Sequence, residues 1–264
     1  MAKYPDGYSR SQFNNALRIY LSLSKTTMHI DHKAGDKMYI DFAGDKLQLI
    51  SFDGTEWEAE VFVAILGCSQ LTYVEAVRSQ KKEDLIKACE NALHYFGGAP
   101  RAIVPDNLRS AVTRGSKYEA IINEEFASFA EHYGVAVVPA RAHRPRDKAL
   151  VEGAVKLVYN RIYPLLDGRR FAELLSINSV IRTGLELYNN TPFTGRSYSR
   201  RDQFEEIERN TLLALNPLRY EIKKQAMATV HNNGHVRLGE DTHFYSVPHS
   251  YTKKKVKLLY TSQR

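Results

Sequence analysis

Three acidic residues, Asp41, Asp106 and Glu152, stand at positions from which carboxylates could do chemistry. Asp41 lies inside a strand-like stretch, residues 37–43, where Asp is disfavoured and costly to bury. Asp106 follows a second strand-like stretch, residues 101–104, and α/β sheets place ligand sites at the carboxyl ends of their strands. Glu152 is an acid among cations, on a stretch that runs from a basic loop into a helix. Three carboxylates without His or Cys ligands favour a hard cation, Mg²⁺ or Mn²⁺.

A site of this kind can do chemistry at phosphorus. Two such ions ~3.5–4 Å apart activate a water or a 3′-hydroxyl and stabilise the leaving oxygen of an in-line displacement. Asp41 would bridge both ions, Asp106 would hold one, and Glu152 would hold the other. Without cations the three acids would repel one another, so we expect the site to need its two metal ions for order.

Each acid also has a structural explanation, which the sequence leaves open. Asp41 could face water from an edge strand. Asp106, in a Pro-Asp-Asn stretch, could be a helix N-cap or an Asx-turn residue. Glu152 could form ion pairs along a helix face, with Lys148 four residues before it and Lys156 four residues after it.

The charge balance points to an acidic partner. The chain of 264 residues has a net charge of +7 and contains 16 Tyr and 11 Phe, a composition that suits a nucleic-acid binder. Residues 141–170 hold eight Lys/Arg against three Asp/Glu, and a second basic group stands near the C-terminus. We therefore expect DNA phosphates to be contacted by Arg141, His143, Arg144, Arg146, Lys148, Lys156, Lys253, Lys254 and Lys255.

The elements that must position the acids follow from hydrophobic periodicity. Alternating or continuous apolar runs predict strands, and apolar residues at helical spacing predict helices. In chain order the pattern predicts strands at 37–43, 61–66 and 71–77, a helix at 82–96, a strand at 101–104, a helix at 119–133, a strand at 135–138 and the Glu152 helix. A small hairpin strand is expected at 47–52. Three antiparallel strands would be extended by two parallel ones, with the first and fourth as neighbours, so the three acids can converge on one edge of the fold.

The chain divides by pattern into four parts. We expect an N-terminal arm at 1–30, a catalytic α/β domain at 31–165, a helical extension at 166–216 and a small all-β barrel at 217–264. No apolar run approaches the length of a membrane span, and no signal peptide is visible at the start. The sequence therefore predicts a cytoplasmic protein with no membrane partner.

The order of several short motifs makes the chain resemble the DDE transposases of the IstA type, relatives of phage Mu transposase and the retroviral integrases. The resemblance covers essentially the whole chain and is carried by Gly35–Gly44, Phe96–Pro100, Val104–Leu108, His132–Gly134, Pro139–Arg141, Asp147–Glu152 and Ser199–Phe204. Each motif alone is weak, and their order makes the match specific.

This resemblance implies an RNase H-like catalytic core, with Asp41, Asp106 and Glu152 matching the three acids of the family. It implies hydrolysis at transposon ends, followed by transfer of the 3′-hydroxyl ends into double-stranded target DNA. It further implies a homo-oligomer on paired ends, a partner AAA+ ATPase, and a bacterial, nucleoid-associated location. Family members carry N-terminal helix-turn-helix domains that read the transposon ends, and no such pattern precedes the catalytic region here.

Two other functions remain compatible with the same fold. One is a non-catalytic DNA-binding or assembly module, and the other is an RNase H-like nuclease that cleaves DNA without joining it. Three intact acids favour the transposase, since a module without chemistry would not need them.

Overall fold

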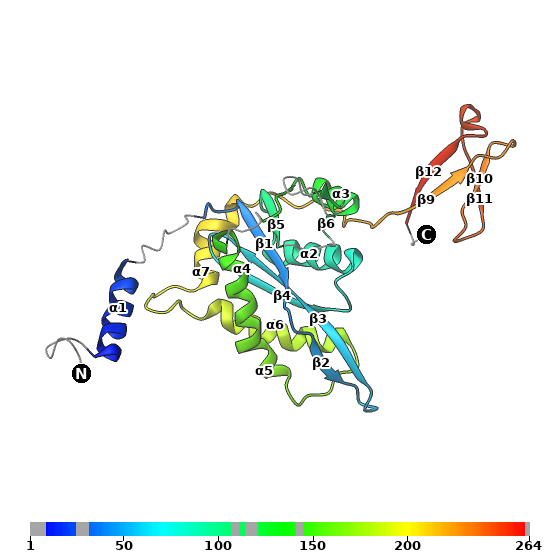
Figure 1. The fold of residues 1–264 in the computed structure, drawn as a ribbon. Helices are drawn as coiled ribbons and strands as arrows, with labels where there is room; N and C mark the ends of the chain where they lie inside the picture. The colour runs from blue at the N-terminus through cyan, green and yellow to red at the C-terminus, as the bar shows by residue number, and fades with distance from the viewer. Residues whose placement is uncertain (1–8, 25–31, 107–110, 114–120, 141–144, 262–264) are drawn as a thin grey trace. The chain divides into compact units, whose positions relative to one another are not determined.

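A computed structural model of the chain describes residues 9–24, 32–106, 111–113, 121–140 and 145–261 (Figure 1). The chain divides into two compact units, Met1–His32 and Lys33–Arg264. The first unit contains helix α1 (Arg10–Ser24), whose apolar side chains Phe13, Leu17 and Tyr20 are exposed. Within the described residues, no helix is both long enough and apolar enough to span a bilayer.

A mixed six-stranded sheet forms the centre of the second unit. Its strands run β2–β3–β1–β5–β8, with β4 paired to β3. The strands are β1 (Lys37–Phe42), β2 (Leu47–Ile50), β3 (Glu56–Leu66), β4 (Thr72–Val77), β5 (Ala102–Pro105) and β8 (Ala136–Val137). Strand β3 pairs antiparallel with β1, β2 and β4. On the other side of β1, β5 pairs parallel with β1, and β8 pairs parallel with β5. The predicted strand order and directions are confirmed, including the contact between the first and fourth predicted strands.

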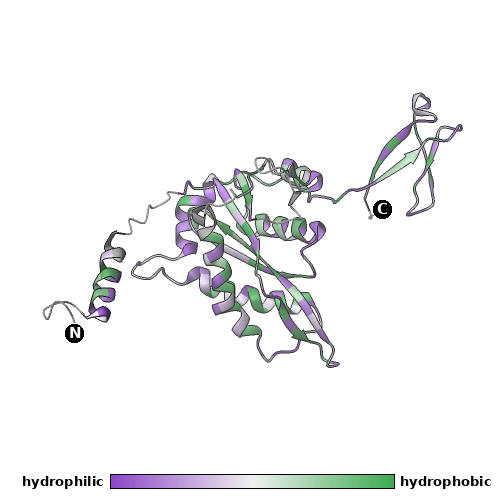
Figure 2. Ribbon diagram, viewed as in Figure 1, coloured by the Kyte–Doolittle hydropathy of each residue, from purple (hydrophilic) through white to green (hydrophobic). Residues whose placement is uncertain are grey.

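Helices occupy both faces of this sheet. The described helical elements of this unit that precede the C-terminal strands are α2 (Lys82–Phe96), α3 (Glu124–His132), α4 (Pro145–Leu157), the π-helical turn η1 (Val158–Ile162), α5 (Tyr163–Leu166), α6 (Leu174–Asn190), α7 (Arg200–Gln203), the π-helical turn η2 (Phe204–Glu208) and the 3₁₀ turn η3 (Arg209–Thr211). Figure 2 shows that the central strands are mostly hydrophobic, as expected for strands that are covered on both faces.

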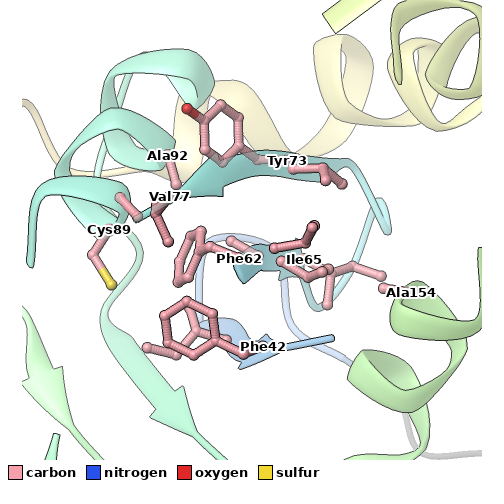
Figure 3. Packing of buried hydrophobic residues seen from close by; sticks show 14 of the residues in the cluster. Phe42, Phe62, Ile65, Tyr73, Val77, Cys89, Ala92 and Ala154 are labelled. Atoms are coloured by element: carbon pink, nitrogen blue, oxygen red, sulfur yellow. The ribbon is translucent and has the colours of Figure 1, made fainter. Parts of the chain in front are cut away.

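Alternation along the strands assigns each face of the sheet to a helix. Phe42 and Phe62 meet edge to face, with ring centroids 5.7 Å apart, and lie on the side of α2, whose Cys89 and Ala92 are buried there (Figure 3). Ile65 points to the other side, toward Ala154 of α4 (Figure 3). Because successive side chains of a strand point to opposite faces, residues next to Phe42 on β1 face α4.

Helix α6 covers the outer edge of β4 with two asparagines. The side chain of Asn178 accepts from the N–H of Ala76 at 2.7 Å and donates to its carbonyl at 3.0 Å. Asn189 makes the same pair of hydrogen bonds with Thr72, at 3.3 and 2.8 Å. An uncovered edge strand invites pairing with another chain. The two amides satisfy this edge, so the helix is an integral part of the core.

The predicted helix at 119–133 is wrong at its start. Ile121 and Ile122 form a short strand, β7, that pairs with β6 (Val112–Thr113). Asn123 then caps α3, because its side-chain oxygen accepts from the N–H groups of Glu125 and Phe126. An N-cap oxygen satisfies backbone donors that the first helical turn leaves unpaired, so the helix begins at the cap.

The described part of the C-terminal region contains four strands, in agreement with the all-β pattern predicted for 217–264. They are β9 (Lys224–Thr229), β10 (His235–Arg237), β11 (Phe244–Ser246) and β12 (Lys255–Tyr260), with a 3₁₀ turn η4 (His249–Tyr251) before the last. Strand β9 pairs with β12 and β10 pairs with β11, in two two-stranded sheets. Closure of these strands into a barrel remains a prediction.

Candidate active site

Asp41 lies on an interior strand of the sheet. Strand β1 is flanked by β3, where Asp41 is opposite Val63, and by β5. The edge-strand explanation for this acid is therefore wrong. Asp41 is half-buried, and its Oδ1 accepts a hydrogen bond from the N–H of Phe42 at 2.8 Å. Since Phe42 faces α2, Asp41 faces the side of the sheet that α4 covers.

Asp106 stands next to Asp41 by strand register. In the parallel pair of β1 and β5, Lys37 is opposite Ala102 and Ile40 is opposite Pro105, so the next step on both strands brings Asp41 and Asp106 together. The N–H of Asp106 donates to the carbonyl of Ile40 at 3.2 Å, which continues this pairing. Neighbouring strands are about 4.8 Å apart. The Oδ1 atom of Asp106 is buried, although the residue as a whole is half-buried.

Glu152 reaches the same side of the sheet on helix α4. This helix packs against β1 and β3, and its buried apolar stripe includes Val151 and Ala154 and continues to Val158 of η1. Glu152 itself is exposed beside the stripe. Lys156 is also exposed, and no described basic side chain lies within ion-pair distance of Glu152. The side chain of Lys148 is outside the described part, so the ion-pair explanation is tested only toward Lys156.

The three acids do not form a closed cluster in this structure. Among the described residues, no group of three His, Cys, Asp or Glu side chains is close enough to hold one metal ion. Asp41 and Asp106 are adjacent by register, and Glu152 is on the helix that covers their face. Convergence of all three on a cation therefore stays a prediction. The donor set itself, carboxylate oxygens only, fits Mg²⁺ or Mn²⁺.

Two tyrosines beyond Glu152 tie its helix to the turn that follows β1. The hydroxyl of Tyr159 accepts from the N–H of Asp45 at 2.7 Å, and the hydroxyl of Tyr163 donates to the carbonyl of Asp45 at 2.5 Å. The two rings meet edge to face, with centroids 5.0 Å apart. Burial is the main cause that raises the pKa of Tyr163 above its ordinary range, so its hydroxyl remains a donor. A Cβ at Gly44 would lie 3.5 Å from the Tyr159 hydroxyl, so this turn and the helix are in close contact.

Helical spacing places Tyr159 on the same face as Glu152, but spacing alone does not reveal the contact with Asp45. The helix continues from α4 into the π-helical turn η1 before Tyr163, which shifts the phase of the following residues. Such turns occur frequently at functional sites and interrupt the regular period. The spacing of tyrosines seven and eleven residues after Glu152 was the only available signal.

Most of the predicted DNA contacts are untested by the structure. Arg141, His143 and Arg144 lie outside the described residues, and the side chains of Arg146 and Lys148 are likewise not described. The remaining residues are exposed, as a DNA contact requires: Lys156, Lys253, Lys254 and Lys255.

This chain is similar to known proteins. Residues 31–145 match the integrase core domain family. The chain is 36% identical over 250 residues to a candidate transposase for insertion sequence IS408 of Burkholderia multivorans, covering 94% of this chain and 48% of that protein. It is 38% identical over 249 residues to a candidate transposase, y4bL/y4kJ/y4tB, of Sinorhizobium fredii, with 94% of this chain and 48% of that protein covered.

Among solved structures, the catalytic core domain of HTLV-2 integrase in complex with magnesium is similar to this chain at 15% identity and a TM-score of 0.48. This match covers 66% of this chain and 99% of that one. The chain spans about half the length of the curated relatives it matches. Over 94% of its length this chain is therefore similar to insertion-sequence transposases, and its residues 31–145 match the integrase core domain family.

Proposed function

We propose that this chain carries the catalytic activity of a DNA transposase. It hydrolyses phosphodiester bonds at transposon ends and transfers the resulting 3′-hydroxyl ends into double-stranded target DNA. The observation that carries this proposal is the register that makes Asp41 and Asp106 neighbours, on the sheet face covered by the Glu152 helix. Two acids side by side at this edge of the sheet bring like charges together, an arrangement that a bound cation stabilises.

Asp41, Asp106 and Glu152 would hold two Mg²⁺ or Mn²⁺ ions. When bound, these ions supply an activated oxygen nucleophile and stabilise the leaving oxygen at phosphorus. The chain's own residues position the three carboxylates: pairing of β1 with β5 aligns the two Asp residues, and Tyr159 and Tyr163 join the Glu152 helix to the turn after β1. Glu152 is exposed on this helix, where incoming DNA can reach it.

The proposed fold, domain boundaries, DNA contacts and partners rest on the resemblance to the transposase family. The core is RNase H-like and the C-terminal strands close into a small barrel. We keep the boundaries at 1–30, 31–165, 166–216 and 217–264 for the arm, core, helical extension and barrel. The basic residues at 141–148, Lys156 and the lysines at 253–255 bind DNA phosphates. The protein acts as a homo-oligomer on paired ends with an AAA+ ATPase, in the bacterial cytoplasm at the nucleoid.

A strand-transfer assay tests the activity. Precut transposon-end DNA and a plasmid target are incubated with Mg²⁺ or Mn²⁺ and the parent protein, Glu152→Gln or Glu173→Gln. Glu173 is an exposed acid next to α6, and its variant makes the same chemical change away from the proposed site. Joined product is expected from the parent and Glu173→Gln, and none from Glu152→Gln.

The assay separates the alternatives by product. Cleavage without joining would identify a nuclease, and DNA binding without either reaction in the full-length protein would identify an assembly module. Equal product from the parent and Glu152→Gln would remove Glu152 from the site. The same comparison in the full-length transposase covers activity that depends on segments outside this chain.

A further inference from the structure

Three arginines and three aromatic rings alternate in one cluster that includes none of the acids described above. Tyr188 lies near the end of α6, Phe193, Arg196 and Tyr198 lie in the segment before α7, and Arg200 begins α7. Arg161, on η1, is near enough to Tyr188 for its charge to lower the pKa of that hydroxyl, although burial raises this pKa more strongly. We call these residues the arginine–aromatic cluster: Arg161, Tyr188, Phe193, Arg196, Tyr198 and Arg200.

Arg200 is held between two rings. Its guanidinium carbon lies 3.9 Å from the centroid of Tyr188 and 4.3 Å from that of Phe193. The Nε atom is buried and has no hydrogen-bond partner within the described part of the chain. Burial lowers the pKa of Arg200 from its ordinary range, so the fold keeps this cation at a cost. A stacked guanidinium is restricted in orientation before any ligand arrives.

The remaining members continue the alternation. Phe193 meets Tyr198 edge to face, with centroids 5.8 Å apart. Arg196 donates to the Tyr198 hydroxyl at 3.0 Å, and its guanidinium carbon lies 5.7 Å from the ring centroid. Arg161 and Arg196 are exposed and the other members are half-buried, so the surface is accessible.

These arginines lack the acids that neutralise neighbouring cations. Arg201 pairs with Glu186 at 3.0 Å, and Arg209 pairs with Glu205 at 2.6 Å. Among the described residues, none of the three cluster arginines has an acidic partner within ion-pair distance. The adjacent Asp202 is already occupied, because its Oδ2 accepts from the N–H and the hydroxyl of Ser199 in a helix cap.

A purely structural role for the stacked Arg200 explains these observations less well than a role in binding a ligand. A leucine or methionine at position 200 could fill the space between the two rings without burying a charge. Uncompensated arginines interleaved with accessible aromatic rings are instead a typical surface for nucleic-acid backbones. Arginine is suited to this role because its planar fork of donors matches the geometry of phosphate oxygens.

We propose that the arginine–aromatic cluster is a second DNA-binding surface, which grips backbone phosphates of duplex DNA outside the acidic site. This proposal rests on the proposed function, since it takes DNA to be the partner. The cluster shares no residue with the basic group at 141–148 or with the C-terminal lysines, and it contributes affinity rather than sequence readout.

Binding of a fluorescent 30-base-pair duplex, measured by anisotropy across a salt series, tests the proposal without requiring catalysis. The cluster variant is R161Q/R196Q/R200Q. The control is K82Q/R209Q/K224Q, which removes the same charge from three cations that already pair with acids: Glu125, Glu205 and Glu240. Thermal unfolding of both variants and of Arg200→Lys checks that the fold is kept.

The cluster variant should bind at least about tenfold more weakly than the control, and its slope of log affinity against log salt should fall by about 0.9 for each lost phosphate contact. Arg200→Lys, which keeps the charge but loses the planar fork, should fall between parent and cluster variant. Equal affinity and slope for cluster variant and control would overturn the second surface and leave the proposed function standing. A parent whose DNA binding does not depend on salt would also overturn the second surface, whereas the proposed function stands or falls with the strand-transfer assay.

Discussion

Tyr159 accepts a hydrogen bond from the backbone N–H of Asp45 at 2.7 Å, across 114 residues of sequence. Tyr163, one helical turn later, donates to the carbonyl of the same residue. Asp45 is four residues after Asp41, and Tyr159 is seven residues after Glu152. The two hydroxyls therefore set the position of the Glu152 helix against the strand of Asp41.

Removing the hydroxyls of Tyr159 and Tyr163 should make strand transfer require more metal while the protein stays folded. In Tyr159→Phe/Tyr163→Phe we expect the half-saturating Mn²⁺ concentration for strand transfer to rise several-fold, because Glu152 is no longer held in register with Asp41. The loss in unfolding free energy should be about 1–3 kcal/mol for two hydrogen bonds. Tyr73→Phe, which removes a hydroxyl bonded to Glu75, is the control. Equal Mn²⁺ dependence in both variants would contradict a positioning role.

Asp106→Asn should abolish metal-dependent chemistry and leave the fold intact. The substitution should also remove the stabilisation of the folded protein that bound Mg²⁺ provides. A cation that binds only the folded state adds about 2.7 kcal/mol at one hundred times its dissociation constant. Thermal unfolding with and without Mg²⁺ should show a stabilising shift in the parent and in Asp167→Asn, a substitution of an exposed acid, and little or none in Asp106→Asn. An equal shift in all three proteins would place the metal elsewhere.

Glu208 should be a large contributor to stability. It is fully buried, and its two oxygens accept from the N–H groups of Gly35 at 3.1 Å and Ser69 at 2.9 Å. Glu208→Ala leaves two buried donors unsatisfied, at about 1–3 kcal/mol each. Urea unfolding should therefore show a loss of roughly 2–6 kcal/mol. Glu206→Ala, an exposed site on the same helical turn, should change little, and a similarly small effect at Glu208 would count against this role.

Glu75 should make the fold less stable as pH rises. Burial raises the pKa of Glu75 above its ordinary value of 4.5, although Asn91 and Tyr73 donate hydrogen bonds to it. The unfolded chain then releases this proton at lower pH than the folded chain does. The stability contribution is thus fully present below pH 4.5 and is lost as pH rises to the raised pKa. Urea unfolding from pH 4 to 7 should show a smaller decline in Glu75→Gln than in the parent or in Glu83→Gln.

The parts of the fold that could be predicted are those with a clear local hydrophobic period. The strand at 37–43 and the helix at 82–96 were predicted almost to the residue, because each has a sustained apolar period. The start of α3 was predicted wrongly, since its position depends on the cap at Asn123 and on a pairing with Val112. The hydrophobic period of one segment does not reveal which other segment pairs with it.

The sequence by itself determined the order of the main strands and helices, the acidic candidates, the basic character and the family resemblance. Only the tertiary structure decided that β1 is interior, that Asp41 and Asp106 share a register, and that Asn178 and Asn189 complete the edge of β4. It also decided that Arg200 is stacked between Tyr188 and Phe193. The physical reason is that periodicity reports which face of a segment is buried, whereas register and side-chain pairing depend on which distant segment buries it.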